Sequence, residues 1–430
     1  MRAFKTGAYT IVDGKFRTMI MAKRLFNVVF FILMLCTAGL TQTMSFDNRF
    51  IPLIQHPYVT VIDRPSHGAF NFFMLTGHQA FGEFDEEIGI PELFGKYDQR
   101  DIAKAIVARG CPNPLRSAFR NLELPWIVQE KLQGQGVDFY FQQQVTNNFS
   151  LGFTWFIMSL NSYQHFNLKK NDSMALTKSE EQELDEVRRS MQEMLCLFGP
   201  RSHQVGWGDL DFYLHFGESW DYTLKFRHID AGLRLGVLIP AGLRRKLDNP
   251  SSIPFGGDGF WGIYGDADAE LELKEDWKLG LLFRINKRIS RTCLQRMPIG
   301  NEPSLFGGVV GPARVDPGFT FIMSPYLSFE NLREGFGARV QYSISVHTED
   351  HWTDKRSDAT VPVSLDKVVK FSEWASDYMT LCVFYDFGKM KVIREFNPIV
   401  NFNWDIPVSF VAAHASAKTT KISLGLEFNW

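Results

Sequence analysis

The chain has 430 residues, 45% of them hydrophobic, and a mean hydropathy of −0.13, which excludes a membrane protein with several apolar helical spans. The formal net charge of −2 gives no basic excess for binding nucleic acid. Aromatic residues make up 14% of the chain, including 39 phenylalanines. A transmembrane β-barrel uses such residues on its outer surface and in its interfacial girdles, and its strands are only half apolar.

The first 40 residues predict an N-terminal extension followed by a secretory signal peptide. Lys23 and Arg24 precede an apolar run, Leu25–Leu35, and small residues follow this run. The run is shorter than the roughly 20 residues of a helical membrane span, so we expect cleavage after export. Two alternatives stay open at this point, which are an uncleaved membrane anchor and lipidation at Cys36.

The mature protein is therefore expected to begin between Gly39 and Ser45, because small residues lie just after the apolar run. Mass spectrometry of protein extracted from membranes checks this expectation. Recovery of an intact peptide covering residues 25–42 from the mature protein would contradict it and favour the anchor.

The last segment, Thr419–Trp430, has the clearest strand pattern. Its apolar residues alternate with polar ones and are Ile422, Leu424, Leu426, Phe428 and Trp430. Period-two alternation places one set on lipid and the other in a polar interior. A terminal strand with an aromatic last residue resembles the C-terminal insertion signal of bacterial outer-membrane proteins. The resemblance implies insertion into outer-membrane lipid with the help of the barrel-assembly machinery.

The same alternation recurs upstream and predicts an all-β protein. We expect a transmembrane antiparallel up-and-down β-barrel over residues 67–430, preceded by a periplasmic segment at 41–66. The predicted strands are 67–77, 136–145, 149–161, 205–216, 221–239, 260–273, 277–289, 317–330, 335–348, 377–387, 394–406 and 418–430. This gives about twelve strands, or fourteen if residues 58–63 belong to a further strand. A break of phase near His228 suggests a bulge.

The connections between these strands alternate between long and short, as in outer-membrane barrels with short periplasmic turns and long outer loops. Two of the long loops contain helical patterns. Thr177 and Glu180 form a capping box before one of them. The other covers Asp98–Arg109, with apolar residues on one face. These helices either pack over the barrel mouth or act as a lid or plug.

Charged residues on the inward faces of the predicted strands are the candidate functional residues. They are Asp209, Asp211, Lys225, Arg227, Asp266, Asp268, Glu270, Glu272, Lys278, Arg284 and Arg339. Folding the hairpins brings opposed residues within side-chain reach. The expected pairs are Glu272–Lys278, Asp266–Arg284, Asp211–Arg227 and Tyr213–Lys225.

Two residues of the acidic ladder, Asp268 and Glu270, would face Leu282 and Gly280 and so have no basic partner across the hairpin. The ladder either fills a narrow barrel or forms an electrostatic constriction. In the second case we expect a modest preference for cations, which salt would screen.

Enzymatic residues are harder to find. His165, His203, His215, His228 and His347 are scattered, and none lies in a short motif with serine and aspartate. No phosphate loop, zinc cluster or EF-hand sequence is present, and the cysteines that follow the signal peptide are far apart. We therefore expect neither an enzyme nor a bound metal or cofactor.

The stretch from Gly208-Asp209 to Pro240-Ala-Gly242 resembles the strand-pair pattern of outer-membrane transporters of hydrophobic compounds. The N-terminal plug motif of that group is not recognisable, so no binding residue is carried over. We expect an outer-membrane channel or transporter for small solutes. The alternative is a structural or adhesive barrel that acts through its outer loops. The sequence names no solute and predicts no nucleic-acid partner.

Overall fold

The computed structural model describes residues 44–45, 48–55, 66–83, 86–169, 176–222, 226–389 and 398–429. Several sequence predictions fall outside these ranges: the signal peptide, the extra strand at 58–63, Lys225 and Trp430. No helix in the described ranges is long and apolar enough to cross a membrane.

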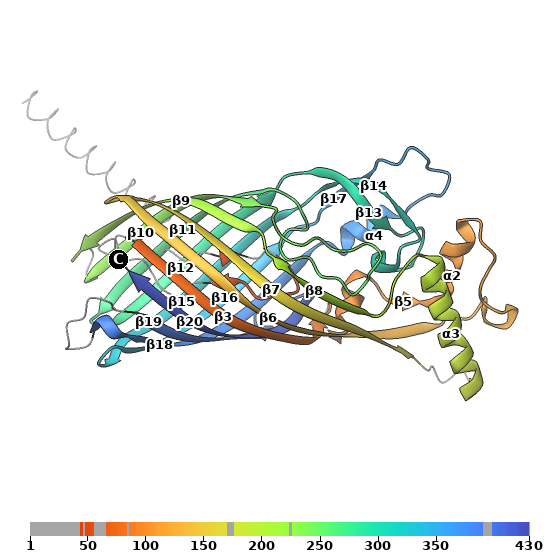
Figure 1. Cartoon of the computed structure of the whole chain (residues 1–430), viewed down its shortest axis with the longest axis horizontal. Helices are drawn as coiled ribbons and strands as arrows, with labels where there is room; N and C mark the ends of the chain where they lie inside the picture. Colours follow the sequence, from red (N-terminus) through yellow and green to blue (C-terminus); the bar gives the residue numbers. More distant parts are fainter. Residues whose placement is uncertain are drawn as a thin grey trace, which may run out of the picture.

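Twelve strands of the described chain form one closed antiparallel barrel, which confirms the predicted fold (Figure 1). They are β3 (Ser66–Phe81), β6 (Pro125–Thr146), β7 (Phe149–Leu168), β9 (Leu210–Asp221), β10 (His228–Ile239), β11 (Gly262–Lys274), β12 (Trp277–Arg288), β15 (Phe319–Arg333), β16 (Phe336–His347), β18 (Trp374–Asp386), β19 (Ile399–Val408) and β20 (Ser416–Asn429). The ring closes because β3 pairs with β20 on one side and with β6 on the other. It leaves no place for the two further strands of the fourteen-strand alternative.

The remaining elements are not part of the twelve-strand ring, although β4, β5 and β8 pair with strands of it. They are β1 (Met44–Ser45), β2 (Ile54–Gln55), β4 (Glu87–Ile88), η1 (Ile90–Phe94), β5 (Tyr97–Asp98), α2 (Gln99–Ala108), η2 (Ser117–Phe119), α3 (Lys178–Met194), β8 (Arg201–Trp207), β13 (Arg291–Met297), η3 (Ser304–Phe306), β14 (Val309–Asp316), β17 (His351–Asp354), α4 (Leu365–Lys370) and η4 (Phe387–Lys389). The two predicted helices are confirmed as α2 and α3, and α3 begins with the expected capping box at Thr177.

The period-two pattern explains how the strands divide the barrel into two faces. In β20, Ile422, Leu424 and Leu426 are exposed, whereas the intervening Lys421, Ser423 and Glu427 are buried. The exposed apolar side chains point away from the barrel, toward lipid, and the polar side chains point into the lumen. The same division holds along β9, β12 and β19, so the inside–outside assignment made from sequence is confirmed for these strands.

One predicted strand, 205–216, is two strands in the structure. Both β8 and β9 pair with β7. β8 pairs with residues 157–163 of this strand, and β9 pairs with residues 149–154. The strand is interrupted at Gly208, where the Phe156 ring packs so closely that a Cβ atom on Gly208 would lie 1.7 Å from it. Gly208 also donates its N–H to Phe156 O at 2.9 Å. Asp209 then turns its carboxylate to backbone N–H groups of the next long loop, those of Gly242 (3.1 Å) and Gly257 (2.9 Å).

The expected bulge near His228 is wrong. β10 pairs with both neighbours without a shift of register, and the phase break marks the turn that precedes the strand. Because β9 continues to Asp221, the hairpin folds further along the chain than the sequence suggested. Asp211 therefore lies opposite Leu238 and Tyr213 opposite Gly236, which corrects the expected pairs Asp211–Arg227 and Tyr213–Lys225.

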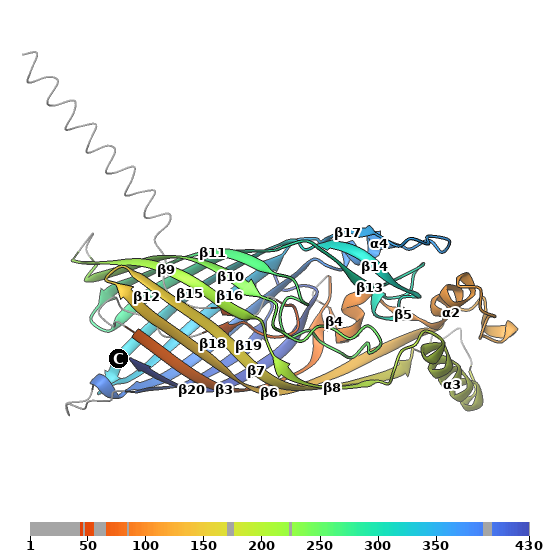
Figure 2. The same cartoon turned by 45° about the horizontal axis from the view of Figure 1, so that its top comes forward.

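Short turns join strands at one end of the barrel, and the long connections leave the other end, as expected. Figure 2 shows α2, α3 and the sheet of β13, β14 and β17 gathered at the long-loop end, with the described C-terminus at the opposite end. Long loops lie outside the cell in barrels of this type, so this end is the outer mouth.

Candidate functional site

The described part of the N-terminal segment, residues 48–55, lies inside the outer half of the lumen. Three inward-facing residues of β20 hold its backbone. Ala417 N donates to Arg49 O at 2.7 Å, Thr419 Oγ1 to Phe50 O at 2.6 Å, and Lys421 Nζ to Leu53 O at 2.9 Å. This stretch was expected in the periplasmic segment. Its position in the lumen follows from its apolar side chains, which find an apolar wall there.

That wall is a hydrophobic patch on the inner face of β3, β6 and β7. Phe50, Ile51 and Ile54 pack in one buried cluster with side chains that the polar-lumen rule does not anticipate. These are Phe73, Leu75, Leu132, Phe156, Met158 and Leu160. Burying an apolar side chain of this size contributes about 1.5–3 kcal/mol. The N-terminal segment and the patch therefore stabilise each other, and the segment closes this part of the lumen.

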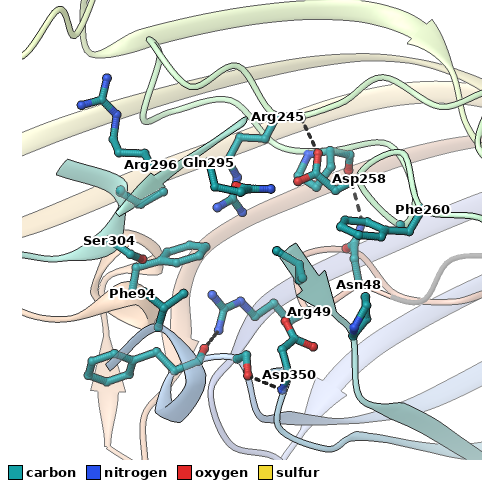
Figure 3. A pocket seen from close by; sticks show the side chains of 18 of the residues that line it. Asn48, Arg49, Phe94, Arg245, Asp258, Phe260, Gln295, Arg296, Ser304 and Asp350 are labelled. Carbon is teal, nitrogen blue, oxygen red and sulfur yellow. Dashed lines mark hydrogen bonds between the residues drawn. The ribbon is translucent and has the colours of Figure 1, made fainter. Parts of the chain in front are cut away.

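A cavity of about 220 Å³ lies between the N-terminal segment and the outer loops (Figure 3). Asn48, Arg49 and Phe50 form one wall, and the loop between β10 and β11 contributes Arg245 and Asp258. The other described walls come from β13, η3, β17, α4 and the start of β18. A ligand in this cavity would touch both the segment that closes the lumen and the loops that face the outside.

The cavity is rich in arginine. Its described lining includes the cationic side chains of Arg49, Arg245, Lys246, Arg288 and Arg296 but only two carboxylates, those of Asp258 and Asp350. Arg288 is neutralised by Asp209, with Nη1 to Oδ2 at 2.8 Å.

The other three arginines have no carboxylate within 4 Å among the described residues. Arg49 donates to Phe371 O at 2.7 Å, and Arg296 donates to Leu247 O at 2.8 Å and Gly307 O at 2.9 Å. The Nε of Arg245 is buried and finds no acceptor in the described chain.

Two of these arginines flank the same aromatic ring. The guanidinium carbons of Arg49 and Arg245 lie 4.1 and 4.5 Å from the ring centroid of Phe94. Burial and the charge of the neighbouring Arg245 lower the pKa of Arg49 to about 9. Burial also lowers the pKa of Arg245 below its ordinary value. Both side chains still carry their charge at neutral pH.

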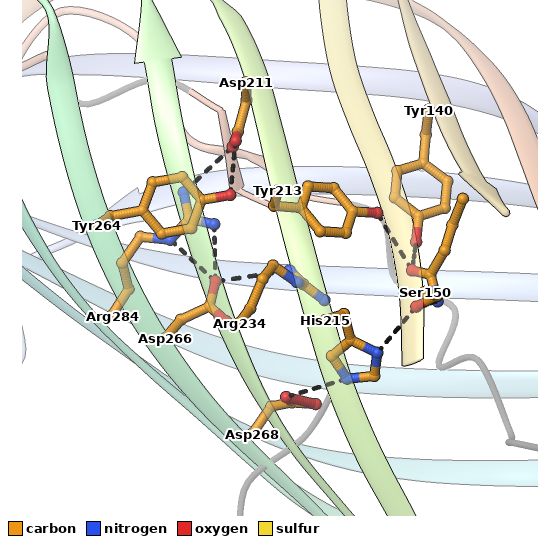
Figure 4. Close-up of polar contacts among 11 residues, drawn as sticks. Tyr140, Ser150, Asp211, Tyr213, His215, Arg234, Tyr264, Asp266, Asp268 and Arg284 are labelled. Carbon is orange, nitrogen blue, oxygen red and sulfur yellow. Dashed lines mark hydrogen bonds and ion pairs between the residues drawn. The ribbon is translucent and has the colours of Figure 1, made fainter. Parts of the chain in front are cut away.

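Deeper in the lumen, a charged network crosses the inner wall (Figure 4). Arg234, Asp266 and Arg284 lie directly opposite one another on β10, β11 and β12. Asp266 Oδ2 lies 2.8 Å from Arg284 Nη2 and 3.5 Å from Arg234 Nη1. Tyr264 donates to Asp211 at 2.5 Å, and Arg284 Nη1 lies 3.5 Å from the other oxygen of Asp211.

These charges are almost completely removed from water. Asp211 is 0% exposed, Arg234 1% and Arg284 2%. Opposite charges and tyrosine hydroxyls compensate the loss of hydration, since an unpaired charge in such a place costs several kcal/mol. The network therefore ties four neighbouring strands together and fills this side of the lumen.

Most of the candidate residues lie where the sequence placed them. Asp211, Asp266, Asp268, Glu270, Arg284 and Arg339 point inward and are buried, and Asp209 is buried at the outer end. Glu272 is opposite Lys278 and Asp266 is opposite Arg284, as expected. Arg227 instead lies in the turn at the short-turn end, where its half-exposed side chain approaches Glu275 at 3.3 Å. It does not face the lumen, because the turn and not the strand contains it.

One residue of the acidic ladder, Glu270, has partners that the hairpin register alone does not reveal. Glu270 lies 2.9 Å from Lys278, its diagonal neighbour, and accepts a hydrogen bond from Tyr326 at 2.6 Å. Asp268 is buried beside His215, 3.9 Å from its Nε2. Of the two carboxylates on which the expected cation preference rested, Glu270 is paired, whereas neither oxygen of Asp268 accepts a hydrogen bond in the described chain, so the preference stays a prediction.

The structure also brings together Ser150, His215 and Asp268, which the sequence left apart. Ser150 Oγ lies 3.2 Å from His215 Nδ1, whereas His215 Nε2 is 3.9 Å from Asp268, too far for a hydrogen bond. Gln142 donates to the same serine hydroxyl at 2.9 Å. All three residues are buried and none lines the outer cavity. This geometry fits a continuation of the buried network and not a nucleophile with access to substrate.

Sequence reasoning missed Arg234 and the three cavity arginines. Arg234 alternates with the exposed Leu233 and Leu235, so the period-two rule could have found it if the phase of β10 had been known. Arg49, Arg245 and Arg296 belong to three separate segments outside the barrel strands, and no local pattern links them. Among the described residues, no cluster of histidine, cysteine and carboxylate side chains could hold a metal ion.

Together, the closed ring, its apolar outer surface and its polar, charged lumen define an outer-membrane β-barrel. No protein-family model matches the sequence, and no curated protein matches it either.

The solved structures to which the chain is similar include outer-membrane channels. One is an outer-membrane channel from Pseudomonas putida F1, with 9% identity and a TM-score of 0.46, covering 85% of this chain and 96% of that one. A FadL homologue from Pseudomonas aeruginosa has 9% identity and a TM-score of 0.31, with coverage of 86% and 90%. The Pseudomonas putida toluene transporter TodX has 9% identity and a TM-score of 0.30, with coverage of 91% and 96%.

Proposed function

We propose that the protein is a gated outer-membrane channel for small solutes, with the N-terminal segment 48–55 as its removable closure. The observation that carries this proposal is the outer cavity. Residues of the outer loops line one side of this cavity, and Asn48, Arg49 and Phe50 line the other. A solute bound there contacts the closing segment directly, so binding is able to shift the segment between a closed and an open position.

The attachment of the segment is consistent with release. Its direct polar ties to the barrel wall are few, and three of them come from the single strand β20. The remaining attachment is apolar packing, which is non-directional and tolerates sliding. By contrast, the charged network around Arg284 is built from directional contacts between four strands, so it is the fixed part of the lumen.

One observation favours the structural or adhesive alternative. The buried network fills one side of the lumen at the level of Asp211 and Arg234, and a barrel that only anchors its loops needs no free path. The two functions differ in conductance, because only the channel conducts when its closure is removed.

The test is single-channel recording in planar bilayers with the full chain and with a variant that lacks residues 48–55. We expect rare, short openings for the full chain and a several-fold larger open fraction for the deletion. Thr419→Val, which removes the donor to Phe50 O, should lie between the two. Thr420→Val is the matched control, because Thr420 is on the opposite face of β20. Equally silent bilayers for the full chain and for a correctly folded deletion would overturn the channel and favour anchoring.

A further inference from the structure

We propose that the outer cavity is a binding site for a small carboxylate with a single aromatic ring, held by Arg49 and Arg245 (Figure 3), whereas the guanidinium group of Arg296 is engaged by the carbonyl oxygens of Leu195, Leu247 and Gly307. This inference rests on the proposed function, since it names the chemistry of the solute that meets the closing segment. The site is assembled only in the fold, from the N-terminal segment, the loop between β10 and β11, and β13.

The charges require an anion. Arg49 and Arg296 are each 7% exposed and donate to carbonyl oxygens, and no carboxylate of the described chain lies within 4 Å of the guanidinium groups of Arg49, Arg245 or Arg296. Buried positive charges without a counter-charge in ion-pair contact are unfavourable, and Arg49 and Arg245, which both lie next to the Phe94 ring, also repel each other. A bound anion removes both penalties and supplies the acceptor that Arg245 Nε lacks.

The two carboxylates of the lining are already engaged by backbone N–H groups. Asp258 Oδ1 accepts from Arg245 N at 2.8 Å, and Asp350 Oδ1 accepts from Gly318 N at 2.9 Å and lies 3.0 Å from His347 Nε2. They hold the loops in place and offset the charges of Arg49 and Arg245 only from beyond 4 Å, so the described lining keeps more positive than negative groups. A planar carboxylate matches the planar fork of a guanidinium better than a spherical anion does.

The rest of the wall is aromatic and the space is limited. Phe50, Phe94, Phe260, Trp352 and Trp374 line the cavity beside the arginines. A cavity of about 150 Å³ accommodates benzene in an engineered protein, so about 220 Å³ leaves room for one ring with its carboxylate. Aromatic walls favour a flat ring over an aliphatic chain through stacked and edge-to-face contacts.

Benzoate, with benzamide as its uncharged isostere, is the probe that tests this site. Binding to the purified full chain in detergent is measured by calorimetry and by quenching of Trp352 and Trp374 fluorescence. We expect benzoate to bind at least about tenfold more tightly than benzamide, because a charge-assisted contact is worth about that factor. Arg245→Met should weaken benzoate about 10- to 100-fold and leave benzamide nearly unchanged.

Arg244→Met is the matched control, since Arg244 is the exposed neighbour in the same loop and does not line the cavity. It should bind benzoate as the unaltered chain does, and Arg245→Lys should retain part of the affinity. Equal affinities for benzoate and benzamide, or an Arg245→Met variant that binds benzoate normally, would overturn the site. Sulfate displacing benzoate at equal concentration would overturn the role of the aromatic wall.

The two proposals fail separately. Benzoate binding that depends on Arg245, in a chain whose 48–55 deletion does not conduct, supports the site and contradicts the channel. A conducting deletion variant in a protein that does not bind benzoate supports the channel and contradicts the site.

Discussion

Replacing Arg284 by methionine is expected to lower the free energy of unfolding of the barrel by about 3–5 kcal/mol. The substitution removes the cation that lies 2.8 Å from Asp266 and 3.5 Å from Asp211, and both carboxylates are buried. The negative charges of Asp211 and Asp266 would then be buried in the barrel wall without this cation. Urea unfolding of the protein folded into lipid vesicles measures the change, read from tryptophan fluorescence.

Two comparisons give this result its meaning. Arg284→Met combined with Asp211→Asn should recover part of the loss, because Asp211 loses its ion-pair partner in the single variant, whereas Asp266 keeps Arg234 at 3.5 Å. Arg227→Gln removes an arginine whose partner Glu275 is largely exposed, so it should leave the free energy of unfolding almost unchanged. If the barrel with Arg284→Met alone were as stable as the unaltered barrel, the buried charged network would contribute no net stability.

Leu281→Arg is expected to prevent stable insertion of the barrel. Leu281 lies near the middle of β12, is 42% exposed and belongs to the outward apolar set. An arginine on the lipid face near the bilayer midplane costs about 2–4 kcal/mol. The folded fraction is measured by the mobility shift of unheated samples in electrophoresis after refolding into vesicles.

Two controls separate the loss of the leucine side chain from the effect of a charge at this position. Leu281→Ala removes the side chain without adding charge and should fold in high yield. Glu275→Arg adds an arginine in the exposed turn just before β12 and should also fold. Equal folded fractions for all three variants would show that β12 does not present this face to lipid.

The sequence predicted the barrel well because its signal is local. Alternation in β20 or β12 is set by a period of two residues, and each strand repeats it independently. The pairs Asp266–Arg284 and Glu272–Lys278 followed because the turn at residues 275–276 is short and leaves one register. The pairs across β9 and β10 did not follow, because the turn there is longer and its ends could not be located.

The candidate site depended on contacts that no local pattern encodes. Residues 48–55 enter the lumen to meet Phe156 and Met158, which are more than 100 residues away. The cavity joins Arg49, Arg245 and Arg296 from three segments that are each unremarkable in sequence. Only the packing of the outer loops against the N-terminal segment brings these charges together.

The lengths of β6 and β7 decide how far the molecule reaches from the cell. β6 has 22 residues, which at about 3.3 Å per residue gives a strand roughly 70 Å long. Tilted by about 40°, it rises roughly 55 Å, whereas the apolar band of such barrels is only about 25 Å tall. The strand therefore exceeds the apolar band by roughly 30 Å in total, and α2 and α3 lie at its outer end, away from the lipid (Figure 1). An antibody that approaches the cell meets these two helices before it meets the barrel.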